Sequence, residues 1–363
     1  MNFELLKKEM KKADLSAILV ENTEIRDSNF FYLTGLKSGL FEPAIAIATQ
    51  ESMHVFVTPL DYNDAKKFLG KDIILMEYKK ENLKKFLLQF KGEKIGVNSG
   101  LMPYSRYIEL KSISKASSFV DCSELLKGLR QVKSDEEIQL ITKANRITKK
   151  ALQDTFDLLE ENMTELQIVA KFEYQLKEYG ADGLAFDTIV AFGANSAVPH
   201  HMPDNTKLKS NNIVLMDVGA KYQNYCADVS RTIIFNPDKS SKKYKDLVQM
   251  YDTVKKAQSL ALGRMKVGSK ASDIHNYAAK FINTVHNGIY NGKFIHSLGH
   301  SLGMDVHDGI SIGPNSNVLL REGMVVTDEP GVYIENLGGV RIEDDIIISR
   351  KGPLVINKGI LPP

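Results

Sequence analysis

This 363-residue chain contains no tryptophan and only two cysteines, and its longest apolar runs are short. Cys122 and Cys226 cannot make the disulfide framework of a small secreted protein, and they suit a reducing compartment. Because a membrane-spanning helix needs about 18 apolar residues, no membrane segment is expected. The amino terminus has an amphipathic helical pattern and lacks the apolar core of a secretory signal, so a cytoplasmic protein is expected.

An excess of either charge sign is also absent. The 47 basic and 45 acidic side chains leave a net charge of +2. Proteins that bind nucleic acid usually carry a basic stripe or patch, so the composition argues against that class. With 43% hydrophobic and 25% charged residues, the chain is typical of a globular protein of two or three domains.

Residues 1–125 are expected to form a separate α/β domain. No glycine-rich loop with the spacing of a nucleotide or phosphate site is found there, so this domain is given a structural role. Apolar segments that predict strands alternate with helical patterns. These segments are residues 17–20, 44–48, 55–57, 73–75 and 95–97.

Residues 126–363 are expected to form a second domain. Its first helix is predicted at Ser134, which has Glu137 at the spacing of a capping box, and a second box is predicted at Thr164 and Gln167. A pair of helices followed by strands occurs twice along this region. Because ligand sites tend to form between such halves, a site is expected where they meet.

Two pairs of acidic residues lie at mirror-image positions around two predicted turns. A four-residue turn at 221–224 would place Asp217 opposite Asp228 on a hairpin. A second, glycine-containing turn would place Glu329 opposite Glu343. Facing side chains have Cβ atoms about 5 Å apart, and like charges at that distance destabilise a sheet unless a cation lies between them.

The two pairs together favour a metal site, although each acid alone would be interpreted as a solvated residue at a strand end. His300 lies between the pairs in the sequence, and four carboxylates neutralise two divalent ions. Oxygen donors with one imidazole suit Mn²⁺ or Co²⁺, while Zn²⁺ and Fe²⁺ also fit. Arg341 lies two residues before Glu343, on the same strand face, where it would orient the carboxylates.

Seven of the eight histidines follow residue 199. His300 and His307 lie in a segment with nearby glycines, and His200 lies in a loop flanked by prolines. Imidazole is both a common metal ligand and an acid near neutral pH, so these three histidines are candidates for the site. His201 and His296 adjoin them, and the sequence leaves their roles open.

Four segments carry the four acids, Arg341, His300 and His307, namely MDVGAKYQNYCADVSRT, HSLGHSLGMDVHDG, EGMVVTDEPGVY and GGVRIEDDIII. In combination they resemble the pita-bread metallopeptidases, in the two-domain Xaa-Pro branch that includes prolidase and aminopeptidase P. The resemblance covers essentially the whole chain. It implies an α/β (α+β) fold, in which a smaller creatinase-like α/β domain precedes a pita-bread catalytic domain with an internal pseudo-two-fold repeat.

The resemblance also implies roles for individual residues. The metal ligands would be Asp217, Asp228, His300, Glu329 and Glu343, with Arg341 supporting them. Asp228 and Glu343 would bridge two ions, and a hydroxide shared by the ions would attack the carbonyl before proline. Glu329 would carry the proton to the leaving nitrogen, while His307 would stabilise the oxyanion and His200 would hold the proline side.

The expected function is therefore hydrolysis of Xaa-Pro dipeptides by a homodimer that associates through its amino-terminal domain. Aminopeptidase P, which accepts longer peptides, is the alternative within the same branch. Methionine aminopeptidases are disfavoured because they usually lack the amino-terminal domain. A non-catalytic protein that holds peptides in the cleft would not need His200, His307 and Arg341.

Overall fold

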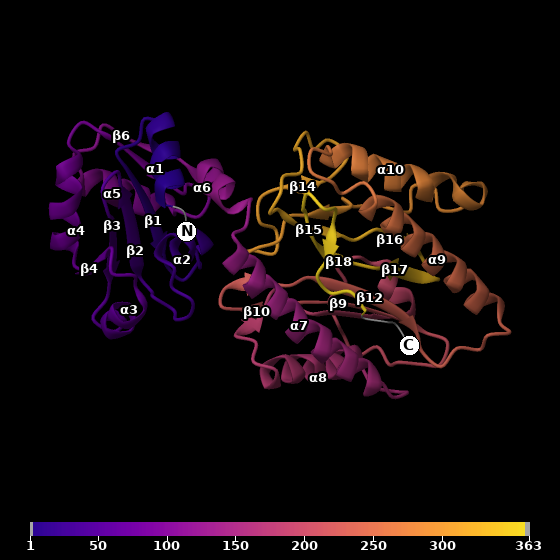
Figure 1. Ribbon diagram of the computed structural model, residues 1–363. Helices are drawn as coiled ribbons and strands as arrows, with labels where there is room; N and C mark the ends of the chain where they lie inside the picture. Colours follow the sequence, from indigo (N-terminus) through magenta and orange to yellow (C-terminus); the bar gives the residue numbers. More distant parts are fainter. Residues whose placement is uncertain (1–2, 360–363) are drawn as a thin grey trace. The chain divides into compact units, whose positions relative to one another are not determined.

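The computed structural model describes residues 3–359 and divides the chain into two compact units, Met1–Arg130 and Gln131–Pro363 (Figure 1). The division follows helix α6 (Ser123–Arg130), a few residues after the boundary expected at 125. Leu126 and Leu129 of α6 are buried, and α6 contacts the first helix of the chain, so it belongs to the first unit. Within residues 3–359, every helix is too short or too polar to span a bilayer.

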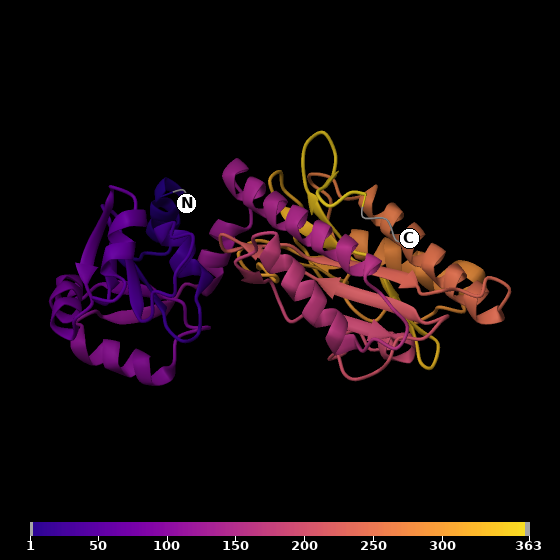
Figure 2. The ribbon, with the colours of Figure 1, turned by 90° about the horizontal axis from the view of Figure 1, so that it is seen from below.

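The first unit is a mixed six-stranded sheet in the order β4-β3-β2-β1-β5-β6. Helices α4 and α5 pack on one face of the sheet, and α2 contacts β1 and β2 (Figure 2). The strands are β1 (Ala17–Asn22), β2 (Ala44–Thr49), β3 (Met53–Val57), β4 (Ile73–Glu77), β5 (Lys94–Val97) and β6 (Ser118–Asp121). The other helices are α1 (Phe3–Lys12), α2 (Ser28–Thr34), α3 (Tyr62–Phe68), α4 (Lys80–Leu87) and α5 (Tyr104–Ile113).

The second unit begins with helices α7 (Asp135–Asp157) and α8 (Glu165–Glu178). The two predicted capping boxes are confirmed at Ser134 and Thr164. Both helices pack against a sheet in the order β12-β9-β8. The strands of this half are β7 (Gly183–Leu184), β8 (Ile189–Phe192), β9 (Ile213–Val218), β10 (Ala220–Tyr222), β11 (Tyr225–Cys226) and β12 (Val229–Ile234).

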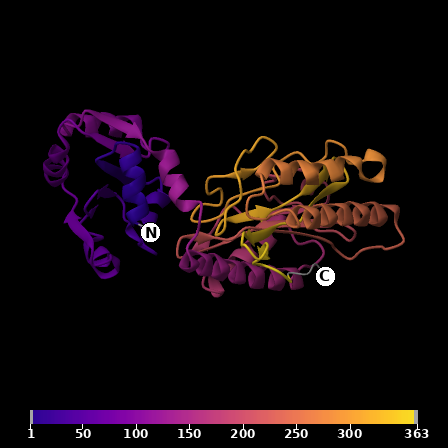
Figure 3. The same ribbon diagram turned by 45° about the horizontal axis from the view of Figure 1, so that its top comes forward.

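The same order of elements follows in the second half, as the sequence predicts. Helices α9 (Lys242–Leu262) and α10 (Ala271–Thr284) share apolar cores with its strands. The strands therefore lie between the α7/α8 pair and the α9/α10 pair (Figure 3). They are β13 (Gly299–His300), β14 (Ser311–Ile312), β15 (Val325–Asp328), β16 (Gly331–Ile334), β17 (Gly338–Arg341), β18 (Asp344–Ile347) and β19 (Leu354–Val355).

The two halves of this unit meet along β12 and the segment from β17 to β18. Thr232 Oγ1 donates to the Arg341 carbonyl at 2.9 Å, and the Glu343 N–H donates to the Ser230 carbonyl at 3.1 Å. Candidate site residues of both halves are thereby brought to one seam.

Candidate metal centre

The first acid pair stands on a hairpin whose register differs from the prediction. The turn contains two residues, Gln223 and Asn224, which both have positive φ, as a tight type I′ turn requires. Asp217 therefore lies opposite Ser230, and the expected pairing of Asp217 with Asp228 is wrong. A shift of two residues preserves the face of a strand, so Asp217 and Asp228 still lie on one face as diagonal neighbours.

Asp228 lies at a break in the predicted strand 225–234. β11 ends at Cys226 and β12 begins at Val229. The Asp228 N–H donates to Asp345 Oδ2 at 3.1 Å instead of to a neighbouring strand. A Cβ on Gly219 would lie 2.0 Å from the Ala227 carbonyl oxygen, so the close approach of the chain here requires glycine.

The second acid pair has the predicted register. Asp328 pairs with Asp344, and Gly331 pairs with Arg341 on the far side of the acids. Glu329 and Glu343 lie between these pairs and therefore face each other.

Acids of both halves converge on His300. Ligand-type atoms of Asp228, His300 and Glu343 all lie within 4.8 Å of one another. His300 Nε2 is 3.3 Å from Glu329 Oε1 and 3.6 Å from Asp228 Oδ2. The Nδ1 atom of His300 lies 3.3 Å from the Ser301 carbonyl oxygen, so a proton on Nδ1 leaves the Nε2 lone pair facing the acids.

The carboxylate oxygens of this group fit metal ions. Asp217 Oδ1, Asp228 Oδ1 and Glu343 Oε1 are buried and accept no hydrogen bond from a protein group. A buried carboxylate oxygen without a partner is costly, and a divalent cation would satisfy it. Oxygen atoms with one imidazole are a donor set that Mn²⁺ and Co²⁺ accept.

Charge repulsion among these acids also favours a bound metal ion. Burial, followed by the carboxylates of Glu343 and Asp217, raises the pKa of Asp228 far above its ordinary value. Burial raises the pKa of Glu329 to about 8. Burial and the neighbouring His307 lower the pKa of His300 to about 4. Asp228 and Glu329 therefore favour protonation without a cation, and a bound cation would favour their ionised forms.

Arg341 is linked by hydrogen bonds to two carboxylates of this group. Its Nη2 donates to Asp217 Oδ2 at 2.6 Å and its Nε donates to Ser230 Oγ at 2.8 Å. Ser230 Oγ in turn donates to Glu343 Oε2 at 2.8 Å. A single buried guanidinium thus holds Asp217 directly and Glu343 through Ser230.

Two of the predicted histidines stand at the edge of the group. His307 is exposed, and its ring centroid lies 4.3 Å from that of His300. His200 is also exposed. It is close enough to affect His296, whose pKa is lowered to about 4 by burial first and by the nearby Arg341 and His200 to a smaller extent.

Sequence reasoning left His296 undecided and did not single out Tyr333 or Ser230. His296 Nδ1 donates to the Ser297 carbonyl at 2.8 Å, which leaves Nε2 to accept from Tyr333 Oη at 2.9 Å. Tyr333 Oη accepts from Arg341 Nη1 at 2.9 Å. The position of His296 four residues before His300 was one signal, but a tyrosine on a strand is ordinarily interpreted as core.

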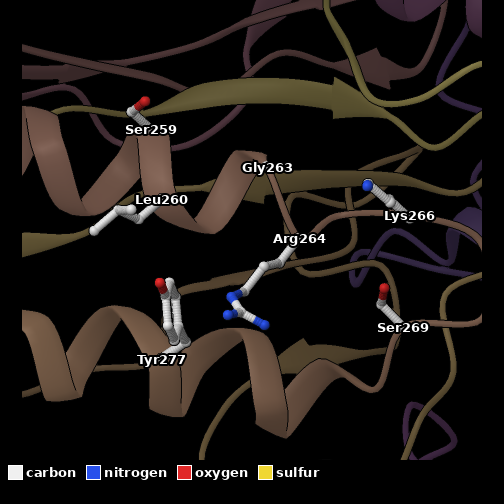
Figure 4. A pocket seen from close by; sticks show the side chains of 7 residues that line it. All are labelled: Ser259, Leu260, Gly263, Arg264, Lys266, Ser269 and Tyr277. Atoms are coloured by element: carbon white, nitrogen blue, oxygen red, sulfur yellow. The ribbon is translucent and has the colours of Figure 1, made fainter.

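A separate hollow of about 480 Å³ lies beside the carboxyl end of α9 (Figure 4). The Arg264 guanidinium lies over the ring of Tyr277 on α10, 3.5 Å from its centroid. None of the lining residues is acidic, so the hollow offers no carboxylate to a metal. They are Ser259, Leu260, Gly263, Arg264, Lys266, Ser269 and Tyr277.

Comparisons with known proteins agree with this geometry. The profile described as metallopeptidase family M24 matches residues 139–350, and that of the creatinase/prolidase N-terminal domain matches residues 3–132. An Xaa-Pro dipeptidase of Pyrococcus horikoshii is 33% identical over 350 residues, which cover 96% of this chain and 94% of that protein.

Solved structures of such proteins are also similar to this chain over nearly its whole length. The crystal structure of a prolidase from Pyrococcus horikoshii has a TM-score of 0.87 at 32% identity, covering 98% of this chain and 97% of that one. An X-Pro aminopeptidase from Thermotoga maritima also has a TM-score of 0.87, at 29% identity and 98% coverage of both chains. The expected amino-terminal and catalytic folds are thereby confirmed.

Proposed function

Because the chain belongs to metallopeptidase family M24, we propose that it is an Xaa-Pro dipeptidase, a prolidase, that uses two divalent metal ions. The observation that carries the proposal is the convergence of acids from both halves on His300, with buried oxygen atoms that no protein group satisfies. The relatives named above include an Xaa-Pro dipeptidase of nearly the same length.

The proposed ligands are Asp217, Asp228, His300, Glu329 and Glu343. Asp217, Asp228 and Glu343 would each offer the ions a buried oxygen that no protein group satisfies. Mn²⁺ or Co²⁺ is the proposed metal. When bound, two such ions lower the pKa of a shared water and polarise the scissile carbonyl.

The side chains around the ions supply the remaining steps. Glu329, whose Oε1 lies 3.3 Å from His300 Nε2, would take a proton from the attacking water and pass it to the leaving imino nitrogen. His307, beside His300, would donate a hydrogen bond to the oxyanion. His200 would hold the proline side of the substrate.

An Xaa-Pro bond differs from other peptide bonds because proline lacks the N–H and has a fixed ring. An X-Pro aminopeptidase is also among the similar structures, so cleavage of longer peptides is the second candidate. The distinction depends on whether the site accepts chain beyond proline.

Release of the first residue from Ala-Pro and from Ala-Pro-Ala tests the proposal. Metal-stripped protein would be assayed with and without added Mn²⁺ or Co²⁺. We expect metal-dependent cleavage of Ala-Pro alone. Cleavage of Ala-Pro-Ala would assign the chain to aminopeptidase P, and inactivity toward both peptides with either metal would favour a methionine aminopeptidase or a peptide-binding protein.

A further inference from the structure

The carboxylate of Glu165, at the start of α8, is completely buried and accepts four hydrogen bonds. Its Oε1 accepts from the Phe192 N–H at 2.7 Å and from Asn195 Nδ2 at 3.0 Å. Its Oε2 accepts from His201 Nε2 at 2.7 Å and from the Asp204 N–H at 3.0 Å. All four donors belong to residues 192–204, the segment that carries His200.

Glu165, His201 and Asp204 also lie close enough together to suggest a metal site. The hydrogen bonding argues against one. Both oxygens of Glu165 already have two N–H donors, whereas Asp228 and Glu343 each keep a buried oxygen without a partner. A cation at Glu165 would have to displace N–H groups that point at the carboxylate, so this cluster is an anchor for the loop.

The anchor acts on both sides of His200. Phe192 and Asn195 precede it, and His201 and Asp204 follow it. The Leu166 N–H of α8 also donates to the Asp204 carbonyl, at 3.2 Å. The side chain of His200 is itself exposed, so the position of its imidazole depends on how the flanking backbone is held.

We propose that Glu165 is a positioning residue for His200: by binding His201 and the backbone around it, Glu165 holds the His200 imidazole where the proline side of the substrate binds. This inference rests on the proposed function. His201, which the sequence left undecided, is then the link between the buried acid and the substrate-binding histidine.

The first test compares Glu165→Gln with Glu178→Gln, an exposed acid on the same helix. Glutamine places an NH₂ group where two N–H donors now point, so two of the four hydrogen bonds are lost and the loop is held less firmly. With Ala-Pro and Mn²⁺, we expect Glu165→Gln to raise KM about tenfold and to change kcat less than about threefold, because His200 contributes binding to substrate and transition state alike. Glu178→Gln should behave as wild type.

The second test separates positioning from general structural damage. In a His200→Ala background, Glu165→Gln should cause less than about a twofold further change in kcat/KM, because both substitutions remove one function. His201→Gln keeps a donor near Nε2 and should retain most activity, whereas His201→Leu should reproduce the KM increase. These His201 variants test the inference even where Glu165→Gln does not fold.

The outcomes are distinguishable. Inactivity of wild-type protein toward Ala-Pro and Ala-Pro-Ala would overturn the proposed function and this inference with it. An active wild type in which the Glu165 and His200 effects multiply would overturn this inference alone. Equal activity of His201→Leu and wild type would do the same.

Discussion

At the scale of single residues, Glu329 is the side chain on which the proposed chemistry most depends. It faces Glu343 across the strand pair, and its Oε1 lies 3.3 Å from His300 Nε2. We expect Glu329→Gln to lower kcat about 10²-fold to 10⁴-fold, because glutamine cannot transfer the proton.

The measurement is hydrolysis of Ala-Pro at saturating Mn²⁺, with bound metal determined for each variant. Glu335→Gln, at an exposed position in the β16–β17 turn, is the control and should be unchanged. Wild-type turnover by Glu329→Gln would contradict the mechanism.

Protonation of the buried acids predicts how stability depends on pH. Burial raises the pKa values of Glu329 and Asp345 to about 8 in the folded protein. Such groups stabilise the fold at low pH, and that stability is lost as pH rises through the folded pKa. The pKa of His300 is lowered to about 4, so His300 makes the stability of the fold rise with pH, but only below its ordinary pKa of 6.5.

The free energy of unfolding of metal-free protein should therefore fall as pH rises from 6.5 through about 8. Each group that titrates in this window contributes up to about 1.4 kcal/mol per pH unit. Denaturant unfolding at a series of pH values measures the slope. Added Mn²⁺ should reduce the slope, because metal binding favours the ionised carboxylates; metal-free stability that rises over this range would refute the prediction.

At the scale of elements, a buried ion pair ties the segment before α7 to the loop that carries His307. Lys133 Nζ lies 3.1 Å from Asp308 Oδ2, and each side chain is only 1% exposed. A Cβ on Gly303 would lie 2.0 Å from Asp308 Oδ2, so this glycine makes room for the pair.

Lys133→Met should lower the free energy of unfolding by about 3–5 kcal/mol, because it removes the lysine partner of a buried carboxylate. Lys127→Met, which removes an exposed pair with Glu124, should cost less than about 1 kcal/mol. Equilibrium denaturation of metal-free protein compares the two variants. Equal losses would show that burial does not decide the contribution of the Lys133 pair.

At the scale of the whole molecule, the association of two chains is a prediction that follows from the family resemblance. Several large apolar side chains of the first unit are exposed, among them Leu40 and Leu60 at 75% and 90%. Exposed apolar surface of this kind can mark a protein contact. Light scattering of the full chain should give twice the chain mass of 40.6 kDa, and a mass of one chain would refute the prediction.

Much of the candidate site could be predicted because side chains alternate between the two faces of a strand and repeat at a fixed spacing along one face of a helix. The faces of Asp217, Asp228, Glu329 and Glu343 follow from alternation along a strand, which survived an error of two residues in the first hairpin. The second turn was identified closely enough to give the observed register of Glu329 with Glu343.

The sequence by itself determined the candidate acids, their faces and the two capping boxes, since each depends on spacing within one segment, and it determined the order of elements along the chain. Only the tertiary structure decided that Asn145 donates to Asp345, 200 residues away, and that Glu165 binds the loop of His200. Alternation along a strand is local to the chain. Contacts between distant segments depend on how separate elements pack, and no single segment contains that information.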